Sequence, residues 1–117
     1  MPTWEDVVAI AAGYPGVVET TSHGRPSLRV GKKFVAAHRS NPDALVLTTT
    51  DMQERGALLE GRPEVFFTTP HYEGYPAVLV RLERIETRLL AELVEDAWRT
   101  HALKRHLREH GSGAREG

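Results

Sequence analysis

The sequence predicts an α+β fold, in which a mainly antiparallel sheet carries an N-terminal and a C-terminal helix packed on it. Both ends of the chain show helical hydrophobic periodicity, and short β-prone segments separated by turns or one short helix lie between them. The expected order is therefore α-β-β-β-β-α-β-β-α. A length of 117 residues is that of one domain. We expect this single domain to span residues 1–110 and residues 111–117 to form a flexible tail.

The two terminal helices are predicted from capping signals and apolar stripes. The first should span residues 3–12, because Thr3 is a suitable N-cap and Asp6 completes a capping box. The last should span residues 87–99, with a break near His101 and a second short helix after it, to about Glu109. The side chains expected to face inward are Trp4, Val7, Val8 and Ala11 in the first helix, and Leu90, Leu93, Val94, Ala97 and Trp98 in the last.

The strands are predicted from β-prone runs bounded by turn residues. Asp51 and Glu54 form a second capping-box pattern, so a short helix should begin there and stop at Gly61-Arg62-Pro63. In the last strand alternate residues are apolar, so one face should be buried by Val78, Val80 and Leu82 and the other, with Leu79, Arg81 and Glu83, mostly wet. The expected strands are residues 17–21, 27–30, 34–37, 44–50, 65–69 and 77–84.

The segment Ser27–Ala37 has the pattern of a β-hairpin around Gly31-Lys32-Lys33. A two-residue loop would pair Arg29 with Phe34 and set charges among apolar groups. A three-residue loop instead pairs Val30 with Phe34 and Leu28 with Ala36, which keeps these four apolar side chains on one face. We therefore expect both Lys32 and Lys33 at the tip and Arg29 on the outer face.

Charge is unevenly distributed although the net charge is only −1. No Asp or Glu occurs between Thr20 and Pro42, so this stretch is basic throughout. Its cationic side chains are Arg25, Arg29, Lys32, Lys33 and Arg39.

Composition excludes several classes of protein. The chain has no cysteine, which rules out disulfides, a thiol nucleophile and a Cys-ligated metal. No apolar run approaches the ~20 residues of a membrane span, and the N-terminus does not read as a signal peptide. These features predict a soluble cytoplasmic protein, for which we expect a monomer or a weak dimer.

Several motifs in order along the chain resemble the MmcQ/YjbR family of small bacterial proteins. The resemblance implies a CyaY-like or double-wing fold, and it implies DNA binding only through the likeness of that fold to double-wing DNA-binding domains. The matching pieces are Trp4-Glu5-Asp6-Val7, Pro15-Gly16-Val17, His23 to Phe34, Glu64 to Leu82 and Ala97-Trp98-Arg99.

The leading functional hypothesis is a DNA-binding protein that uses the basic hairpin to contact the phosphate backbone weakly and without sequence preference. The competing interpretation is an ordinary solvated turn, because charges at a hairpin also discourage edge pairing. The residues expected to contact nucleic acid are Arg25, Arg29, Lys32, Lys33, Arg39, His71 and Tyr72.

The loop from Thr69 to Pro76 supports an alternative hypothesis, a non-catalytic module that binds a small ligand or a protein partner. His71, Tyr72 and Tyr75 are able to stack on a base or line a pocket, or else to pack structurally over the sheet edge. The usual nucleophile, phosphate-loop and metal signatures are absent, so an enzyme is only the third hypothesis, and no cofactor is expected. The pair His106 and His110 has helical metal-ligand spacing but lacks further ligands, so no metal is expected.

Overall fold

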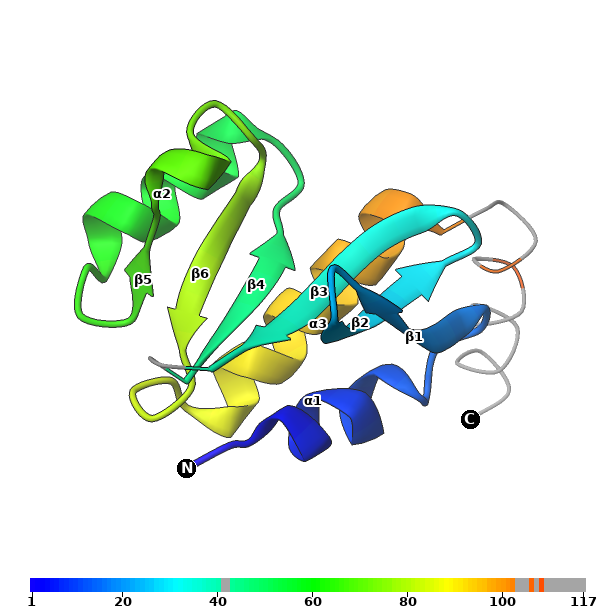
Figure 1. Ribbon diagram of the computed structural model, residues 1–117. Coiled ribbons are helices and arrows are strands. Elements are labelled where there is room, and N and C mark those ends of the chain that lie inside the picture. The colour runs from blue at the N-terminus through cyan, green and yellow to red at the C-terminus, as the bar shows by residue number, and fades with distance from the viewer. Residues whose placement is uncertain (41–42, 103–105, 107, 109–117) are drawn as a thin grey trace.

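The computed structural model describes residues 1–40, 43–102, 106 and 108. The order of elements along the chain is the expected one, apart from a short 3₁₀ helix, η1, in the loop before the last strand (Figure 1). The elements are α1 (Trp4–Ala11), β1 (Val17–Ser22), β2 (Arg25–Val30), β3 (Lys33–Arg39), β4 (Ala44–Thr48), α2 (Met52–Gly61), β5 (Phe66–Phe67), η1 (Pro70–Tyr72), β6 (Ala77–Arg81) and α3 (Thr87–His101).

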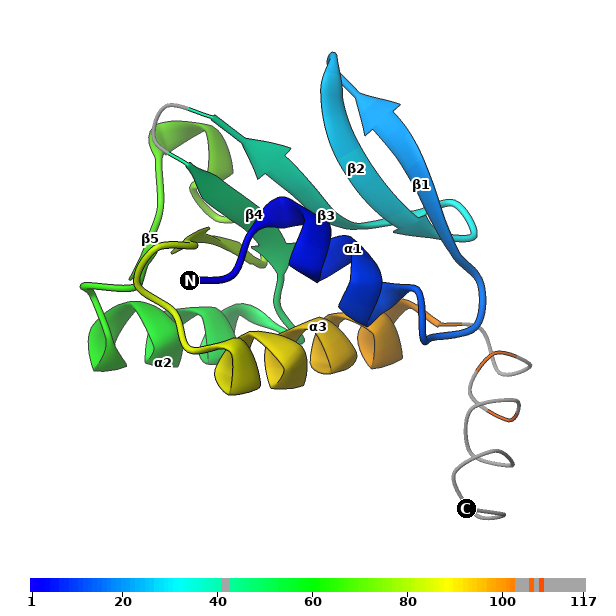
Figure 2. The same ribbon diagram turned by 90° about the horizontal axis from the view of Figure 1, so that it is seen from below.

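The six strands form one sheet in the order β1-β2-β3-β4-β6-β5, and every pairing is antiparallel. Helices α2 and α3 lie on the same side of this sheet, while the β1–β2 turn stands on the side away from them (Figure 2). We call these two sides the helix face and the open face. The predicted α+β class and antiparallel sheet are confirmed. Among the described residues, no helix has the length and apolar character required to cross a bilayer.

The helix face carries the main core. The five side chains expected to face inward from α3 are its buried residues, and Trp98 is fully buried. Its ring stacks on Tyr14 at 5.0 Å between centroids, and its indole N–H donates to the carbonyl of Pro15 at 2.8 Å. Burial raises the pKa of the Tyr14 hydroxyl, and the nearby Glu95 carboxylate adds to the rise. These contacts join the segment after α1 to the last helix.

Helix α1 begins as its capping signals predict. The backbone N–H of Asp6 donates to the Thr3 hydroxyl at 3.3 Å, and the backbone N–H of Thr3 donates to the Asp6 carboxylate at 2.8 Å. At the start of α2 only one of the two hydrogen bonds of a capping box forms. Asp51 accepts from the Glu54 N–H, but the Glu54 carboxylate accepts from the N–H of Thr50, one residue before the cap.

The open face buries more apolar side chains than its sequence pattern predicts. Leu79 was expected on a mostly wet face, yet it is fully buried. It belongs to a second small cluster with Ala37, Val46 and Ala77, which is covered by three partly buried aromatic rings, those of Phe34, Phe67 and Tyr72. The expectation fails because the loop between β5 and β6 folds back over this part of the sheet.

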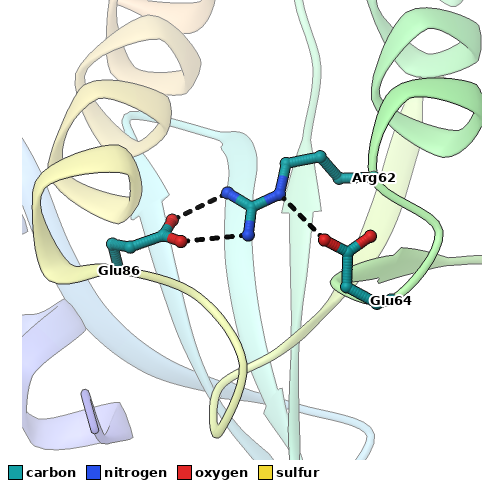
Figure 3. A network of polar contacts seen from close by, with 3 residues as sticks. All are labelled: Arg62, Glu64 and Glu86. Atoms are coloured by element: carbon teal, nitrogen blue, oxygen red, sulfur yellow. Dashed lines mark hydrogen bonds and ion pairs between the residues drawn. The ribbon is translucent and has the colours of Figure 1, made fainter.

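An ion-pair network connects the end of α2 to the start of α3 (Figure 3). The guanidinium of Arg62 donates two parallel hydrogen bonds to Glu86, at 2.8 and 2.9 Å, and a third to Glu64 at 3.1 Å. The hydrogen bonds from Arg62 hold the pKa of the Glu86 carboxyl below its usual range. Because all three side chains are exposed to solvent, this network contributes little to the free energy of folding. Its main effect is to connect the end of α2 to the start of α3.

Helix α3 ends where a break was predicted. His101 is its last residue, and Ala102 has an extended backbone with ψ of 142°. The predicted second helix lies largely outside the described residues, although His106 and Arg108 have helical backbone. His106 is buried against Gly16, where an added Cβ would come within 2.6 Å of its ring. The predicted tail, residues 111–117, lies outside the described residues.

Candidate functional site

The β2–β3 hairpin turns through two residues, Gly31 and Lys32, and not three as the apolar pattern predicts. Val30 pairs with Lys33 and Arg29 with Phe34. Gly31 has a φ of 60°, the positive value that glycine supplies at the first position of a tight hairpin turn. Turn chemistry therefore sets the register at the tip.

A β-bulge then restores the apolar register away from the tip. The pairing shifts between Leu28 and Arg29, so that Leu28 pairs with Ala36 as predicted. Val35 is the extra residue on β3, and one unpaired residue on one strand is what a bulge inserts. Leu28, Val30 and Ala36 reach the main core, but Phe34 lies with the open-face cluster. The prediction that Phe34 shares their face is wrong because the two-residue turn moves it to the other side.

This geometry separates the basic residues of the hairpin. Arg29 pairs with Phe34 and lies on the open face, as expected, and Lys32 is at the tip. Lys33 pairs with Val30, whose side chain is on the helix face, and its charge acts on His101 at the end of α3. Burial lowers the pKa of the His101 imidazole, and the positive charge of Lys33 lowers it further. Lys33 is therefore not part of the surface that carries Arg29.

The loop after β5 is held in place by a buried arginine of α2. Arg55 is 8% exposed. Its Nε donates to the carbonyl of Ala77 at 3.0 Å, and one terminal nitrogen donates to the Thr68 hydroxyl at 3.0 Å and to the carbonyl of Tyr72 at 3.4 Å. These bonds fix both ends of the loop that bears His71 and Tyr72. Sequence reasoning missed this role, since an arginine in a helix reads as exposed.

Between this loop and the β1–β2–β3 strands lies a cavity of about 410 Å³. We call it the groove. It is lined on one side by Ser22, His23 and Arg25, and on the other by Arg39, His71 and Tyr72. This volume is in the range of small-ligand pockets, roughly 300–1,000 Å³. Four of the seven residues predicted to contact nucleic acid thus line one cavity.

The two arginines of the groove lie beyond the paired part of adjacent strands. The pairing of β2 with β3 runs only as far as Ser27 and Ala37, and the β1–β2 turn end stands away from β3 (Figure 2). Arg25 and Arg39, which follow on the two diverging strands, both line the groove. Neither arginine forms an ion pair with another described residue, and no acidic side chain lines the groove. The arrangement is electrostatically suited to a bound anion.

The β1–β2 turn supplies a groove residue that was not predicted. His23 has a φ of 53° and Gly24 a φ of 76°, the two positive values of the tight turn that best matches strand twist. This turn places His23 beside the loop residues His71 and Tyr72. The signal was available in the sequence, since His-Gly between two β-prone runs is a hairpin pattern.

A metal-binding site is not found in the part of the chain that the structure describes. No group of three or more His, Asp or Glu side chains there is arranged to hold an ion. His110, one member of the histidine pair considered from sequence, lies outside the described residues.

The fold is that of a known class of small α+β proteins. A crystal structure of the Deinococcus radiodurans protein DR2400, with a domain designated DUF419, superposes with a TM-score of 0.75, covering 95% of this chain and 89% of that one at 21% identity. At that identity the likeness shows the fold alone.

The family model named YjbR matches residues 12–100, and the chain belongs to the YjbR family. The uncharacterized proteins Mb2600 of Mycobacterium bovis and Rv2570 of Mycobacterium tuberculosis are each 40% identical to it over 121 residues. The match covers 89% of this chain and 92% of each relative. The names of these relatives assign no activity, so a function has to be argued from the groove.

Proposed function

We propose that the protein is a non-catalytic DNA-binding protein, or more broadly a nucleic-acid-binding protein, that contacts the phosphate backbone through the open face. Arg25 and Arg39 form the central phosphate site. Arg29 and Lys32, on the open face and at the tip of the same hairpin, extend it. Lys33 is left out because it belongs to the helix face.

The observation that carries the proposal is the arginine pair without an acid. Both guanidinium groups line one cavity that no acidic side chain lines, and a phosphate bound there would gain a charge-assisted contact with each. Contacts of this kind position a strand without reading its sequence. Three or four such contacts predict weak binding that depends strongly on salt.

The test is a fluorescence-anisotropy titration of labelled single-stranded and duplex oligonucleotides at several salt concentrations. About three phosphate contacts give a log–log slope near −2 on single strands and near −3 on duplex. The double substitution Arg25→Gln and Arg39→Gln should reduce the single-strand slope by about 1.5. The matched control, Arg84→Gln with Arg88→Gln, removes the same charge from exposed arginines outside the groove and should leave the slope unchanged.

Two results would contradict the proposal. One is the absence of salt-dependent binding at about 20 mM salt. The other is an equal loss in the groove variant and in the control, which would show that only net charge matters. The cavity also supports a second candidate, a module that binds a small anionic ligand. Thermal-shift screening of anionic metabolites would favour it if one of them stabilised the wild type but not the groove variant.

A further inference from the structure

We infer that the groove accepts one unpaired nucleotide of a single strand, with its phosphate at the arginine pair and its base against the aromatic side chains. This inference rests on the proposed function and specifies its substrate, since it requires a single strand and not a duplex. Three features support it: a second cavity, the aromatic rings that surround that cavity, and a buried hydroxyl.

A smaller cavity of about 220 Å³ adjoins the groove. The two share Ser22, His23, Phe34, His71 and Tyr72 in their linings. Arg25 and Arg39 line only the larger cavity, and Tyr75 lines only the smaller one. The combined site therefore has a basic end and an aromatic end that meet at common residues. A nucleotide has the same two parts, an anionic phosphate and a flat base.

The aromatic end is a cluster of rings in mutual contact. His71 lies edge-on to Tyr72, with centroids 4.8 Å apart, and Tyr72 lies edge-on to Tyr75 at 6.4 Å. Phe34 completes the wall from β3. Tyr75 is 45% exposed, so one side of its ring is accessible to a ligand. Exposed aromatic rings beside a basic groove form the stacking platform that single-strand binders use.

Thr69 adds a polar group to the same wall. Its Oγ1 is buried and has no hydrogen-bond partner among the described residues, although the residue lines the groove. A buried hydroxyl without a partner costs free energy, which a ligand donor or acceptor would recover once rotation about χ1 brings the oxygen to the groove. A base offers such groups on its edge.

The accessibility of its bases determines whether a single strand or a duplex can place a base in the groove. A base in a duplex has to be unpaired and unstacked before it enters a pocket, whereas a base in a flexible single strand is already accessible. Duplex binding would then use only the phosphate contacts. The structure thus predicts a preference for single strands that resides in the aromatic end and is separable from the salt dependence of the arginine end.

The experiment compares three probes on the wild-type protein by anisotropy. These are a labelled 15-nucleotide thymidine strand, a strand of equal length made of abasic sites, and a duplex. The first and second carry the same phosphates and differ only in their bases. Stacking of one base predicts that the thymidine strand binds about five- to a hundredfold more tightly than the abasic strand.

The matched variants are Phe34→Leu with Tyr72→Leu, which keep apolar cover over Leu79 but remove two of the four rings, and Tyr72→Phe, which keeps the ring. The leucine variant should bind the thymidine strand with a clearly reduced preference over the abasic strand while retaining the wild-type salt slope. The phenylalanine variant should keep the preference. Thermal melting of each variant verifies that the fold is intact before binding is compared.

Equal binding of the thymidine and abasic strands by the wild type would overturn the inference and leave the phosphate proposal standing. An unchanged preference in the leucine variant, or duplex binding as tight as single-strand binding, would also overturn it. Failure to bind any of the three probes at low salt would overturn both. Free thymidine 5′-monophosphate that displaces the strand at a concentration as low as the strand itself would reassign the site to a free nucleotide.

Discussion

The two faces of the sheet are built from the same strands but are closed in different ways. On the helix face, α1, α2 and α3 cover a continuous apolar core in which Trp98, Leu90 and Val80 are fully buried. On the open face, a short loop covers only the four-residue cluster around Leu79. The groove beside it is lined by Arg25 and Arg39, which form no ion pair with a described residue, and by His23 and His71. One face is completed by the chain itself, and the other has room and charge for another molecule.

The difference teaches that stability and binding are separable in this fold. Burial of large side chains provides most of the stabilising free energy of a small domain, and those side chains are concentrated on the helix face. The groove residues are mostly exposed or half-buried. Substitutions on the helix face should therefore change the free energy of unfolding, and substitutions in the groove should change the affinity for nucleic acid.

The largest expected effect comes from removing the ring at the centre of the helix face. Trp98→Ala deletes a fully buried side chain and its contacts with Tyr14 and Pro15. The free energy of unfolding should fall by about 3–5 kcal/mol, measured by urea denaturation. The control is Tyr75→Ala on the open face, a half-exposed ring whose loss should change stability little. Comparable losses in the two variants would contradict the separation of the faces.

The next effect tests the residue that links the two faces. Arg55→Met keeps the volume of the side chain but leaves the carbonyl oxygens of Ala77 and Tyr72 without its hydrogen bonds. Unfolding free energy should fall by about 1–3 kcal/mol, and oligonucleotide binding should weaken because the loop loses its anchor. Arg88→Met, at an exposed position of α3, serves as the control. Full binding by Arg55→Met would show that the loop is placed without this arginine.

A smaller effect is expected from the pH dependence of His101. Its folded-state pKa is lowered by burial and by Lys33. It therefore contributes stability that is present above the unfolded value, near 6.5, and that is lost as pH falls through the folded value. His101→Gln should remove this part of the acid sensitivity in urea denaturation followed from pH 7 to pH 5.

The pKa of His101 also shows on which face of the hairpin Lys33 and Arg29 lie. In an NMR titration, Lys33→Ala should move the His101 pKa up toward its usual value, because a positive neighbour is removed. Arg29→Ala should not move it, because Arg29 lies on the open face. Equal shifts from the two substitutions would contradict the placement of these residues on opposite sides of the hairpin.

The smallest effect should follow Arg62→Ala at the exposed ion pairs between α2 and α3. Exposed pairs of this kind contribute little and are screened by salt. The pKa of Glu86 is lowered by its hydrogen bonds with Arg62, so the contribution is present at neutral pH and is lost as pH falls through the folded value. Thermal melting at low salt should show a slight difference from wild type at pH 7 that shrinks as pH falls toward 3, with Arg84→Ala as control.

Much of the fold was predictable because its signals are local or periodic. The cap at Thr3 and the inward residues of α3 follow directly from helical spacing. The apolar pattern of the hairpin predicts a three-residue loop, but the loop has two residues. Gly31 adopts the positive φ of a tight turn, and a bulge further along the strands restores the apolar pairing. Leu79 was misplaced because burial of a strand face by a distant loop leaves no periodic trace in the strand.

The groove was only partly predictable. Arg25, Arg39, His71 and Tyr72 were predicted from charge and composition, and the structure brings them together. Their proximity depends on how β3 pairs with its neighbours and on the anchor from Arg55, neither of which the sequence states. Lys33 was grouped with them because a three-residue loop would have placed it at the hairpin tip. The two-residue turn makes it the first residue of β3, paired with Val30 and on the helix face.

The anchor provided by Arg55 has a consequence for how this loop tolerates change. The guanidinium donates to two backbone carbonyls and one threonine hydroxyl, and none of these hydrogen bonds involves the side chains of His71 or Tyr72. The path of the loop is thus specified independently of the side chains at its tip. Tyr72 also covers the cluster around Leu79, but the exposed His71 is free to be exchanged while the scaffold is preserved, so different recognition preferences can arise within one architecture by substitution at that position.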